Sequence, residues 1–441
     1  MNRYTSLFVV ALMLFFDLKG QENAKTGWNF GVLPAISFDS DLGFQYGGLV
    51  NFFDYGDGAR YPVYNHSLYF ELSRFTKGSG IYRFYYDSDR LLKGLNVTTD
   101  LSYIPEQAYD FYGFNGFESV YNKVWENDAH EDYRTRMFYK MQQNLFRFKT
   151  DIQGAIAQGN FRWIAGFNLL NFRIGSVDVD KLNRGKKDAD KLPPVSEQPG
   201  LYEKYINWGL ISQNEANGGF IPEIKAGLVY DTRDNRPNPM RGIWTEAVLV
   251  GVPEFLGAES GFTKISITHR QYFTLIPDDL SFAYRLGWQQ TLSGHVPFYY
   301  QSQIVTSVMS GASSTGLGGA RSLRGVKRNR IVGDGMVFGN FEMRWKPVYF
   351  HLFDQAFYLG VNSFLDVGQI TSLIEVESRL PQIAEDVTDY FRFGAEDWHM
   401  SYGLGIRVAM NRNFILAVDY GRAVDSQDGN SGVYVGLNYL F

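Results

Sequence analysis

Apolar and polar residues alternate along most of the chain with a period of two. From Met400 to Met410 every second residue is apolar, and small or charged residues such as Arg407 lie between them. Strict alternation over about ten residues predicts a β-strand with two unlike faces. No segment shows a comparably convincing helical period, so the pattern predicts an all-β protein.

The alternation divides the chain into sixteen expected strands. We place them at 27–38, 42–54, 65–77, 79–88, 94–103, 136–149, 158–174, 219–231, 242–252, 263–274, 279–292, 336–346, 356–367, 400–410, 413–421 and 432–441. The long connections are then 104–135, 175–218, 293–335 and 368–399, and all four lie on the same side of the sheet. An even strand number, with long loops on one side and short turns on the other, is typical of a bacterial outer-membrane barrel.

The same alternation fits a soluble sandwich or a membrane barrel, which differ in the face that is turned outward. A tilted strand of about ten residues is long enough to cross the hydrocarbon layer. Charged residues and glycines recur in mid-strand on one face, and aromatic residues gather at strand ends, as interfacial girdles do. We therefore predict a sixteen-stranded antiparallel transmembrane β-barrel in the outer membrane, in contact with its lipid.

The N-terminal segment has the pattern of an export signal. Arg3 is followed by an apolar run from Leu7 to Phe16, which is too short to span a bilayer but suits a signal-peptide core. We expect residues 1–20 to be a signal peptide and residues 21–441 to form the barrel.

A basic cluster stands out between the expected strands at 279–292 and 336–346. The stretch from Thr315 to Arg330 reads TGLGGARSLRGVKRNR, whereas the whole chain has a formal net charge of −5. A local cluster in an acidic chain argues against nucleic acid, and the stretch lacks the Gly-Lys-Ser/Thr ending of a phosphate-binding loop. The chain contains no cysteine, and we find no residue spacing that supports a catalytic site, a metal site or a cofactor.

Four motifs, in order along the chain, resemble those of the BamA/TamA outer-membrane barrels of the bacterial surface antigen type. They are YDTRDNRPNPMRG at 230–242, LRGV at 323–326, GNFEMRWKP at 339–347 and FLDVG at 364–368. The C-terminal YVGLNYLF also resembles the assembly signal of outer-membrane strands, carried by Gly436, Tyr439 and Phe441. The pattern places Tyr439 and Phe441 on the same apolar face as Val433.

The resemblance implies that the sixth outer loop folds back into the lumen, with an Arg-Gly motif at its tip. Here the motif is Arg324 and Gly325. Glu342, Arg344 and Asp366 alternate with apolar residues on their strands, so the pattern predicts that they face the lumen. We expect Arg324 to form an ion pair there with Glu342 and Asp366.

The resemblance also implies a function in the insertion, assembly or translocation of proteins at the outer membrane. The first expected strand begins near Gly27, which leaves no room before it for the periplasmic POTRA modules that receive client proteins in full-length members. A periplasmic or lipoprotein partner is therefore expected to supply that part, and outer-membrane proteins are the expected clients. A small-solute channel or transporter and a lipid-active outer-membrane protein are the alternatives. We expect no enzymatic activity.

Overall fold

The computed structural model describes residues 25–441 except 62, 158, 236–237, 308–315, 353–354, 383–386 and 411–413. The expected signal peptide at 1–20 lies outside the described residues. The strands are β1 (Trp28–Pro34), β2 (Ser37–Asp39), β3 (Gly43–Asp54), β4 (His66–Phe75), β5 (Gly80–Leu92), β6 (Leu95–Asp110), β7 (Lys140–Ala155), β8 (Phe161–Gly175), β9 (Phe220–Asp231), β10 (Gly242–Val252), β11 (Phe262–Ile276), β12 (Leu280–Gly294), β13 (Gly335–Leu352), β14 (Gln355–Ser372), β15 (His399–Met410), β16 (Phe414–Ala423) and β17 (Ser431–Leu437).

The helices are short and lie in the connections. They are α2 (Val179–Asn183), α3 (Leu201–Asn207), α4 (Phe298–Gln301) and the 3-10 turns η1 (Gly116–Glu118), η2 (Lys123–Glu126), η3 (Asp188–Asp190), η4 (Glu254–Leu256), η5 (Glu377–Gln382) and η6 (Ser426–Asp428). None of the described helices has the length and apolar character needed to cross a membrane.

The strands form one closed antiparallel sheet. From β2 to β17 each strand pairs with its neighbour in sequence, and β17 returns to pair with β2. β1 and β2 both pair with β3 and are two parts of one strand, separated at Ala35 and Ile36. The structure is therefore a sixteen-stranded barrel, which confirms the predicted fold class.

The two faces of the wall have opposite chemistry. On β15, Leu404 and Ile406 are 62% and 58% exposed, whereas Ser401 and Arg407 are fully buried. The outward face is thus apolar and the inward face is polar, the reverse of a soluble barrel in water. Lipid on the outside is the environment that this arrangement fits.

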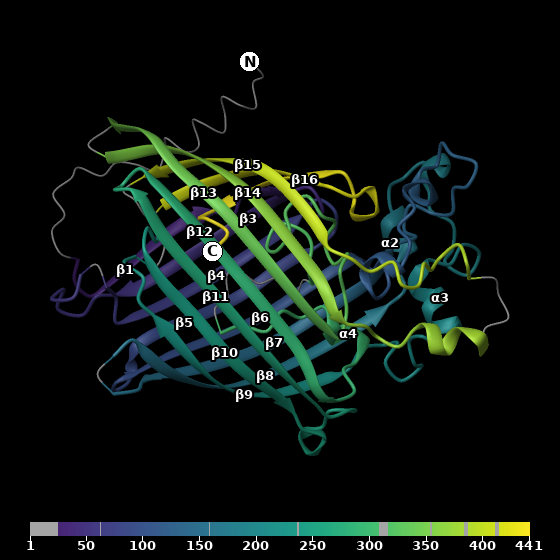
Figure 1. Cartoon of the computed structure of the whole chain (residues 1–441), viewed down its shortest axis with the longest axis horizontal. Coiled ribbons are helices and arrows are strands. Elements are labelled where there is room, and N and C mark those ends of the chain that lie inside the picture. Colours follow the sequence, from purple (N-terminus) through teal and green to yellow (C-terminus); the bar gives the residue numbers. More distant parts are fainter. Residues whose placement is uncertain are drawn as a thin grey trace.

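The long connections gather at one end of the barrel together with α2 and α3 (Figure 1). They run from 111 to 139, 176 to 219, 295 to 334 and 373 to 398, close to the predicted bounds. The main difference is that β6 and β14 extend beyond the predicted ends at 103 and 367. Their last residues therefore belong to the wall and not to the loops.

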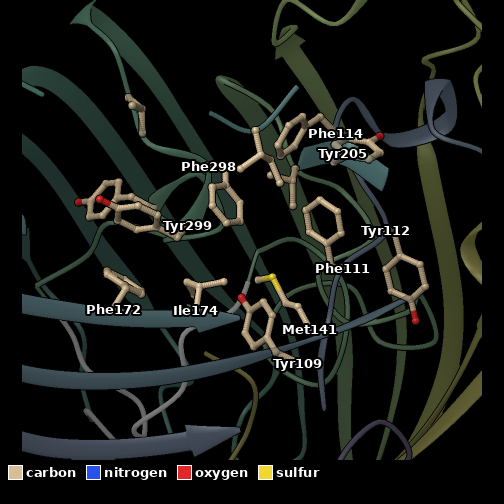
Figure 2. Packing of buried hydrophobic residues seen from close by; sticks show 14 of the residues in the cluster. Tyr109, Phe111, Tyr112, Phe114, Met141, Phe172, Ile174, Tyr205, Phe298 and Tyr299 are labelled. Atoms are coloured by element: carbon tan, nitrogen blue, oxygen red, sulfur yellow. The ribbon is translucent and has the colours of Figure 1, made fainter. Parts of the chain in front are cut away.

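Aromatic side chains from these outer loops form the largest buried apolar cluster. Phe111 packs edge-on against Tyr205 with ring centroids 5.2 Å apart, and Phe114 contacts the same ring at 5.3 Å. Phe298 of α4 joins them (Figure 2). These loop aromatics therefore build an outer cap, where edge-on pairs add to the burial of apolar area.

The barrel closes through a very short seam. β17 and β2 share two partner positions, Tyr434 with Asp39 and Val435 with Phe38, whereas β16 and β17 share seven. β1 ends at Pro34, whose ring removes a backbone donor. Among the described residues β1 pairs with β3 alone, so its other edge, Trp28 to Pro34, has no strand beside it.

The last strand ends earlier than the alternation predicts. β17 stops at Leu437, and Asn438 has a φ of 68°, which turns the chain away from the wall. Tyr439 and Phe441 are buried and contact inward-facing residues. The prediction that they share the lipid-facing side of Val433 is therefore wrong, because one left-handed residue reverses the alternation.

We predict that the seam register can be trapped by a disulfide. The chain has no native cysteine, so Phe38→Cys with Val435→Cys gives a clean background. These residues lie directly opposite one another, where Cα atoms about 5.5 Å apart suit a disulfide. Mild oxidation of the purified barrel should crosslink this pair, measured by non-reducing gel electrophoresis. Phe38→Cys with Leu437→Cys is the control, and equal crosslinking of that displaced pair would contradict the register.

Candidate functional site

Residues 316–334, which we call the tongue, lie inside the barrel between β12 and β13. A bridge between Leu317 and Ile331 joins the two arms of the tongue. Leu323 and Val326 pack with Ile370 of β14 in a buried cluster. The tongue therefore rests an apolar side on the wall, although its composition is strongly basic.

Glycine is required where the tip of the tongue meets the wall. Gly325 has a φ of 97°, and a Cβ there would lie 2.5 Å from the carbonyl carbon of Gly421 on β16. A Cβ on Gly421 would in turn lie 2.4 Å from the backbone oxygen of Arg324. Both positions lack a side chain because two backbones approach each other closely there.

Arg324 lies between carboxylates of two neighbouring strands. Its Nε and Nη2 donate to the two oxygens of Asp366 at 2.9 and 3.0 Å, and its Nη1 donates to Glu342 Oε1 at 2.7 Å. Its backbone N–H also donates to Asp366 at 3.0 Å, and its guanidinium lies 3.5 Å from the ring centroid of Phe364. A planar, permanently charged fork suits such two-point binding.

Further polar side chains satisfy the two carboxylates. Asn340 donates to Asp366 Oδ1 at 2.8 Å, and Arg344 Nε donates to Glu342 Oε2 at 2.8 Å. Burial alone lowers the pKa of Arg324, but Asp366 and Glu342 outweigh that effect and raise the pKa above its ordinary value. The structure thus brings together the predicted residues Arg324, Glu342, Arg344 and Asp366, with Arg324 only 1% exposed.

The chain matches the Omp85 superfamily domain over residues 65–441. It belongs to the Omp85 superfamily. The BamA of Haemophilus ducreyi lacking POTRA domains 1–3 has a similar fold, with a TM-score of 0.56 and 14% identity over 94% of this chain and 71% of that one. CdiB from Escherichia coli gives a TM-score of 0.54 and 12% identity over 94% of this chain and 63% of that one. No curated protein sequence matches the chain.

As a sixteen-stranded Omp85 barrel, the protein belongs to the outer membrane. Its tongue also has anchors that the sequence did not single out. Arg328 donates to Glu106 at 2.6 Å and to Asp110 at 2.9 Å, both near the end of β6. Burial alone lowers the pKa of Arg328, but these two carboxylates raise it well above its ordinary value.

Arg330 is held by backbone oxygens of two outer loops. Its three donors reach Gly116 at 2.7 Å, Ser119 at 2.8 Å and Gln427 at 2.7 Å. The basic run contained Arg328 and Arg330. The partners of Arg328 were not predictable because the strand was expected to end at residue 103, and those of Arg330 are backbone oxygens of loops that are distant in sequence. In this Omp85 barrel the tongue is therefore anchored at its tip to β13 and β14, and at its base to β6 and the outer loops.

We predict that removing the tip anchor destabilises the barrel. Arg324→Ala leaves the buried Asp366 without its counter-ion, a change that costs about 3–5 kcal/mol in a dry interior and less in a hydrated lumen. Asp366→Asn should act in the same direction, and Arg324→Asp combined with Asp366→Arg should recover part of the loss. Urea unfolding in detergent measures the stability of each variant, and protease cleavage in whole cells measures how accessible the tongue has become.

Arg321→Ala is the matched control for this series. Arg321 lies three residues before Arg324 in the tongue, but its side chain is exposed and forms no ion pair within the described part of the chain. We expect the Arg321 variant to behave like the wild type. If Arg324→Ala were no less stable than Arg321→Ala, the ion pair would not hold the tongue.

The close approach of the two backbones gives a separate prediction. Gly325→Ala should lower the free energy of unfolding by about 1–3 kcal/mol, as at other strained backbone sites. Alanine is disfavoured at a positive φ, and its Cβ would also collide with the backbone of Gly421. Gly316→Ala is the control, since its Cβ would meet no atom closer than 3.4 Å. Equal unfolding midpoints for the two variants would show that the tip does not need glycine.

Proposed function

We propose that this Omp85 barrel inserts or translocates proteins at the outer membrane and that the seam beside β1 is the working surface. One observation carries the proposal: β1 has a free edge in the wall of a barrel that is otherwise closed. Lipid cannot satisfy the polar groups of an unpaired edge, so such an edge favours pairing with another strand.

The register shows which groups of β1 face the free edge. Gly27 and Ala35 bond to the β3 side, since Ala35 N–H donates to Gly47 at 3.0 Å and the Gly27 oxygen accepts from Tyr55 at 2.9 Å. Hydrogen-bonding direction alternates along an antiparallel strand. The backbone groups of Trp28, Phe30 and Val32 therefore point to the open edge, as does the Pro34 carbonyl. An incoming strand could add there by main-chain pairing.

The side chains on the same residues favour a membrane location for this pairing. Trp28, Phe30 and Val32 are 58%, 71% and 52% exposed, and all three are apolar. An incoming outer-membrane strand has the same alternation, with an apolar lipid-facing side. The client class that fits this edge is thus an unfolded outer-membrane protein or a polypeptide passing beside it.

The tongue makes a simple pore the weaker alternative. Its buried arginines and apolar residues connect the lumen wall from β6 to β16, so solute passage through the lumen would require their displacement. We propose that residues 1–20 direct export and that a periplasmic or lipoprotein partner delivers clients. Among the described residues there is no cluster of metal-binding side chains that could support lipid turnover.

The test is client insertion by proteoliposomes in which the seam is locked or free. Liposomes carrying the Phe38→Cys and Val435→Cys barrel are offered a urea-unfolded eight-stranded outer-membrane protein, and folding is followed by the heat-dependent gel shift. The reduced barrel should speed folding several-fold over plain liposomes, and the disulfide should abolish that gain. If a reductant then restores the gain in folding rate, damage from the oxidation step is excluded as its cause.

Two outcomes would count against the proposal. If the locked seam inserted clients as fast as the reduced one, β1 would not be the working surface. If the reduced barrel gave no gain but showed steady single-channel conductance in planar bilayers, the channel alternative would be favoured.

A further inference from the structure

Four polar side chains meet on the lipid-facing surface of β10, β11 and β12, which lie side by side in the wall (Figure 1). They are Thr245, His269, Gln271 and Tyr284, and we call them the polar patch. Thr245 lies opposite His269, and Gln271 lies opposite Tyr284. The alternation of the strands turns all four outward, because the residues beside them in sequence, such as Glu246 at 1% exposure, face the lumen.

The polar patch lies within the apolar band of the wall. On β11, Ile267 precedes it and Phe273 follows it, and both are exposed apolar residues on the same face. On β12, exposed Leu286 lies beside it. Apolar neighbours on both sides place the patch in the hydrocarbon and not among the headgroups. Polar side chains are costly there and mark functional surfaces.

The four side chains form one chain of hydrogen bonds. The Tyr284 hydroxyl donates to Gln271 Oε1 at 2.7 Å, so the Tyr284 oxygen accepts from His269 Nε2, which lies 3.3 Å away. In the neutral imidazole that lipid favours, Nδ1 then accepts from the Thr245 hydroxyl at 2.7 Å. All the donors therefore point in one direction, from Thr245 towards Gln271.

The chain of hydrogen bonds has an acceptor at one end and a donor at the other. Within the described part of the protein, the Thr245 side-chain oxygen accepts no hydrogen bond and Gln271 Nε2 donates none. Hydrocarbon cannot satisfy either group. A second polar patch, turned by half a rotation, would bring its donor end to the acceptor end of the first, and the reverse. The polar patch is thus complementary to itself.

The wall beside the polar patch carries small side chains. Ala247 follows Thr245 on the outward face of β10, and Ala165 and Ala226 lie opposite one another on β8 and β9, where both are exposed. Small residues let two membrane-embedded surfaces approach closely. The approach needed for hydrogen bonds between two walls is therefore not blocked on this side.

We propose that the polar patch is a docking surface for a second copy of this chain, in a symmetric dimer that forms within the membrane. The two copies contribute two equivalent sets of hydrogen bonds. Phe273 and Phe341, whose rings lie 6.2 and 6.3 Å from that of Tyr284, flank these hydrogen bonds with apolar contact.

The dimer leaves the seam of each copy free. Five strands separate β11 from β17 in one direction around the barrel, and eight separate it from β2 in the other. The docking surface and the seam are therefore on different sides of the wall. The inference goes beyond the proposed function and does not depend on it, so each can fail without the other.

A cysteine at the edge of the polar patch tests the contact directly. Ile243 lies opposite Gln271 on the lipid-facing side, and the chain has no native cysteine. Two-fold symmetry keeps this residue of one copy near the same residue of the other. A short thiol-to-thiol crosslinker added to Ile243→Cys barrels in liposomes should give dimers on denaturing gels. Leu404→Cys on β15, which is 62% exposed, is the control and should give several-fold fewer.

Substitutions at the two ends of the hydrogen-bond chain test its role. Energy transfer between barrels labelled with donor or acceptor dyes gives the dissociation constant as lipid is added. Gln271→Leu and Thr245→Val each remove two symmetric contacts, so we expect each to raise that constant about ten-fold or more. Thr99→Val is the matched control, because Thr99 also faces lipid, on β6, with its hydroxyl 3.1 Å from that of Thr150.

The three substitutions place apolar residues in lipid, so the barrel should stay folded, which the heat-dependent gel shift checks. The proposal is overturned if wild-type barrels stay monomeric at the highest ratio of protein to lipid. It is also overturned if Gln271→Leu and Thr245→Val both leave the dissociation constant unchanged, or if Leu404→Cys crosslinks as well as Ile243→Cys. A different membrane protein that co-purifies with the wild type but not with Gln271→Leu, while the pure barrel is monomeric, would assign the polar patch to that partner and exclude the dimer.

Discussion

Inside a barrel surrounded by lipid, the permanent charge of Arg324 requires carboxylates, and this requirement organises the centre of the molecule. Asp366 and Glu342 provide three oxygens within 3.0 Å of its guanidinium nitrogens. Because these carboxylates lie on β14 and β13, the tongue is fixed to the part of the wall that follows it in sequence. The close backbone contact of Gly325 with Gly421 then fixes the tip against β16.

Glu342 links the tongue to residues 438–441, which follow β17. One of its oxygens accepts from Arg324 and the other accepts from Arg344, which also binds the backbone oxygen of Phe441. A single carboxylate thus lies between Arg324, which anchors the tongue, and Arg344, which binds the C-terminal residue. A change in either arginine alters the hydrogen bonds available to the other, which gives the lumen a direct physical connection to the last strand.

The wall is closed by long ladders everywhere except at one short seam. Closure of the sheet removes unpaired edges from lipid, and the fourteen interior strands, β3 to β16, achieve this with longer ladders, such as the sixteen partner positions of β13 and β14. The seam retains two partner positions because Pro34 ends β1 and Asn438 turns the residues after β17 inward. A longer ladder would pair more of this edge, so the short seam is the feature on which the proposed handling of other chains rests.

The sequence by itself determined the wall and the sides on which its residues lie. A period of two assigns each residue to a face from local information alone, so it placed Glu342 and Asp366 in the lumen and predicted sixteen strands with long loops on one side. The Arg-Gly motif was identifiable through its resemblance to known barrels. These features follow from neighbouring residues and need no knowledge of distant ones.

Only the tertiary structure decided where strands end and which distant residues meet. The partners of Arg328 depend on the extension of β6 beyond residue 103, and the outer cap depends on loops that are far apart in sequence. The inward turn of residues 439–441 rests on one positive φ at Asn438, which an alternating pattern does not reveal. The physical reason is that strand ends and loop contacts are set by competition between long-range partners, whereas the side on which a strand residue lies is set by its immediate neighbours.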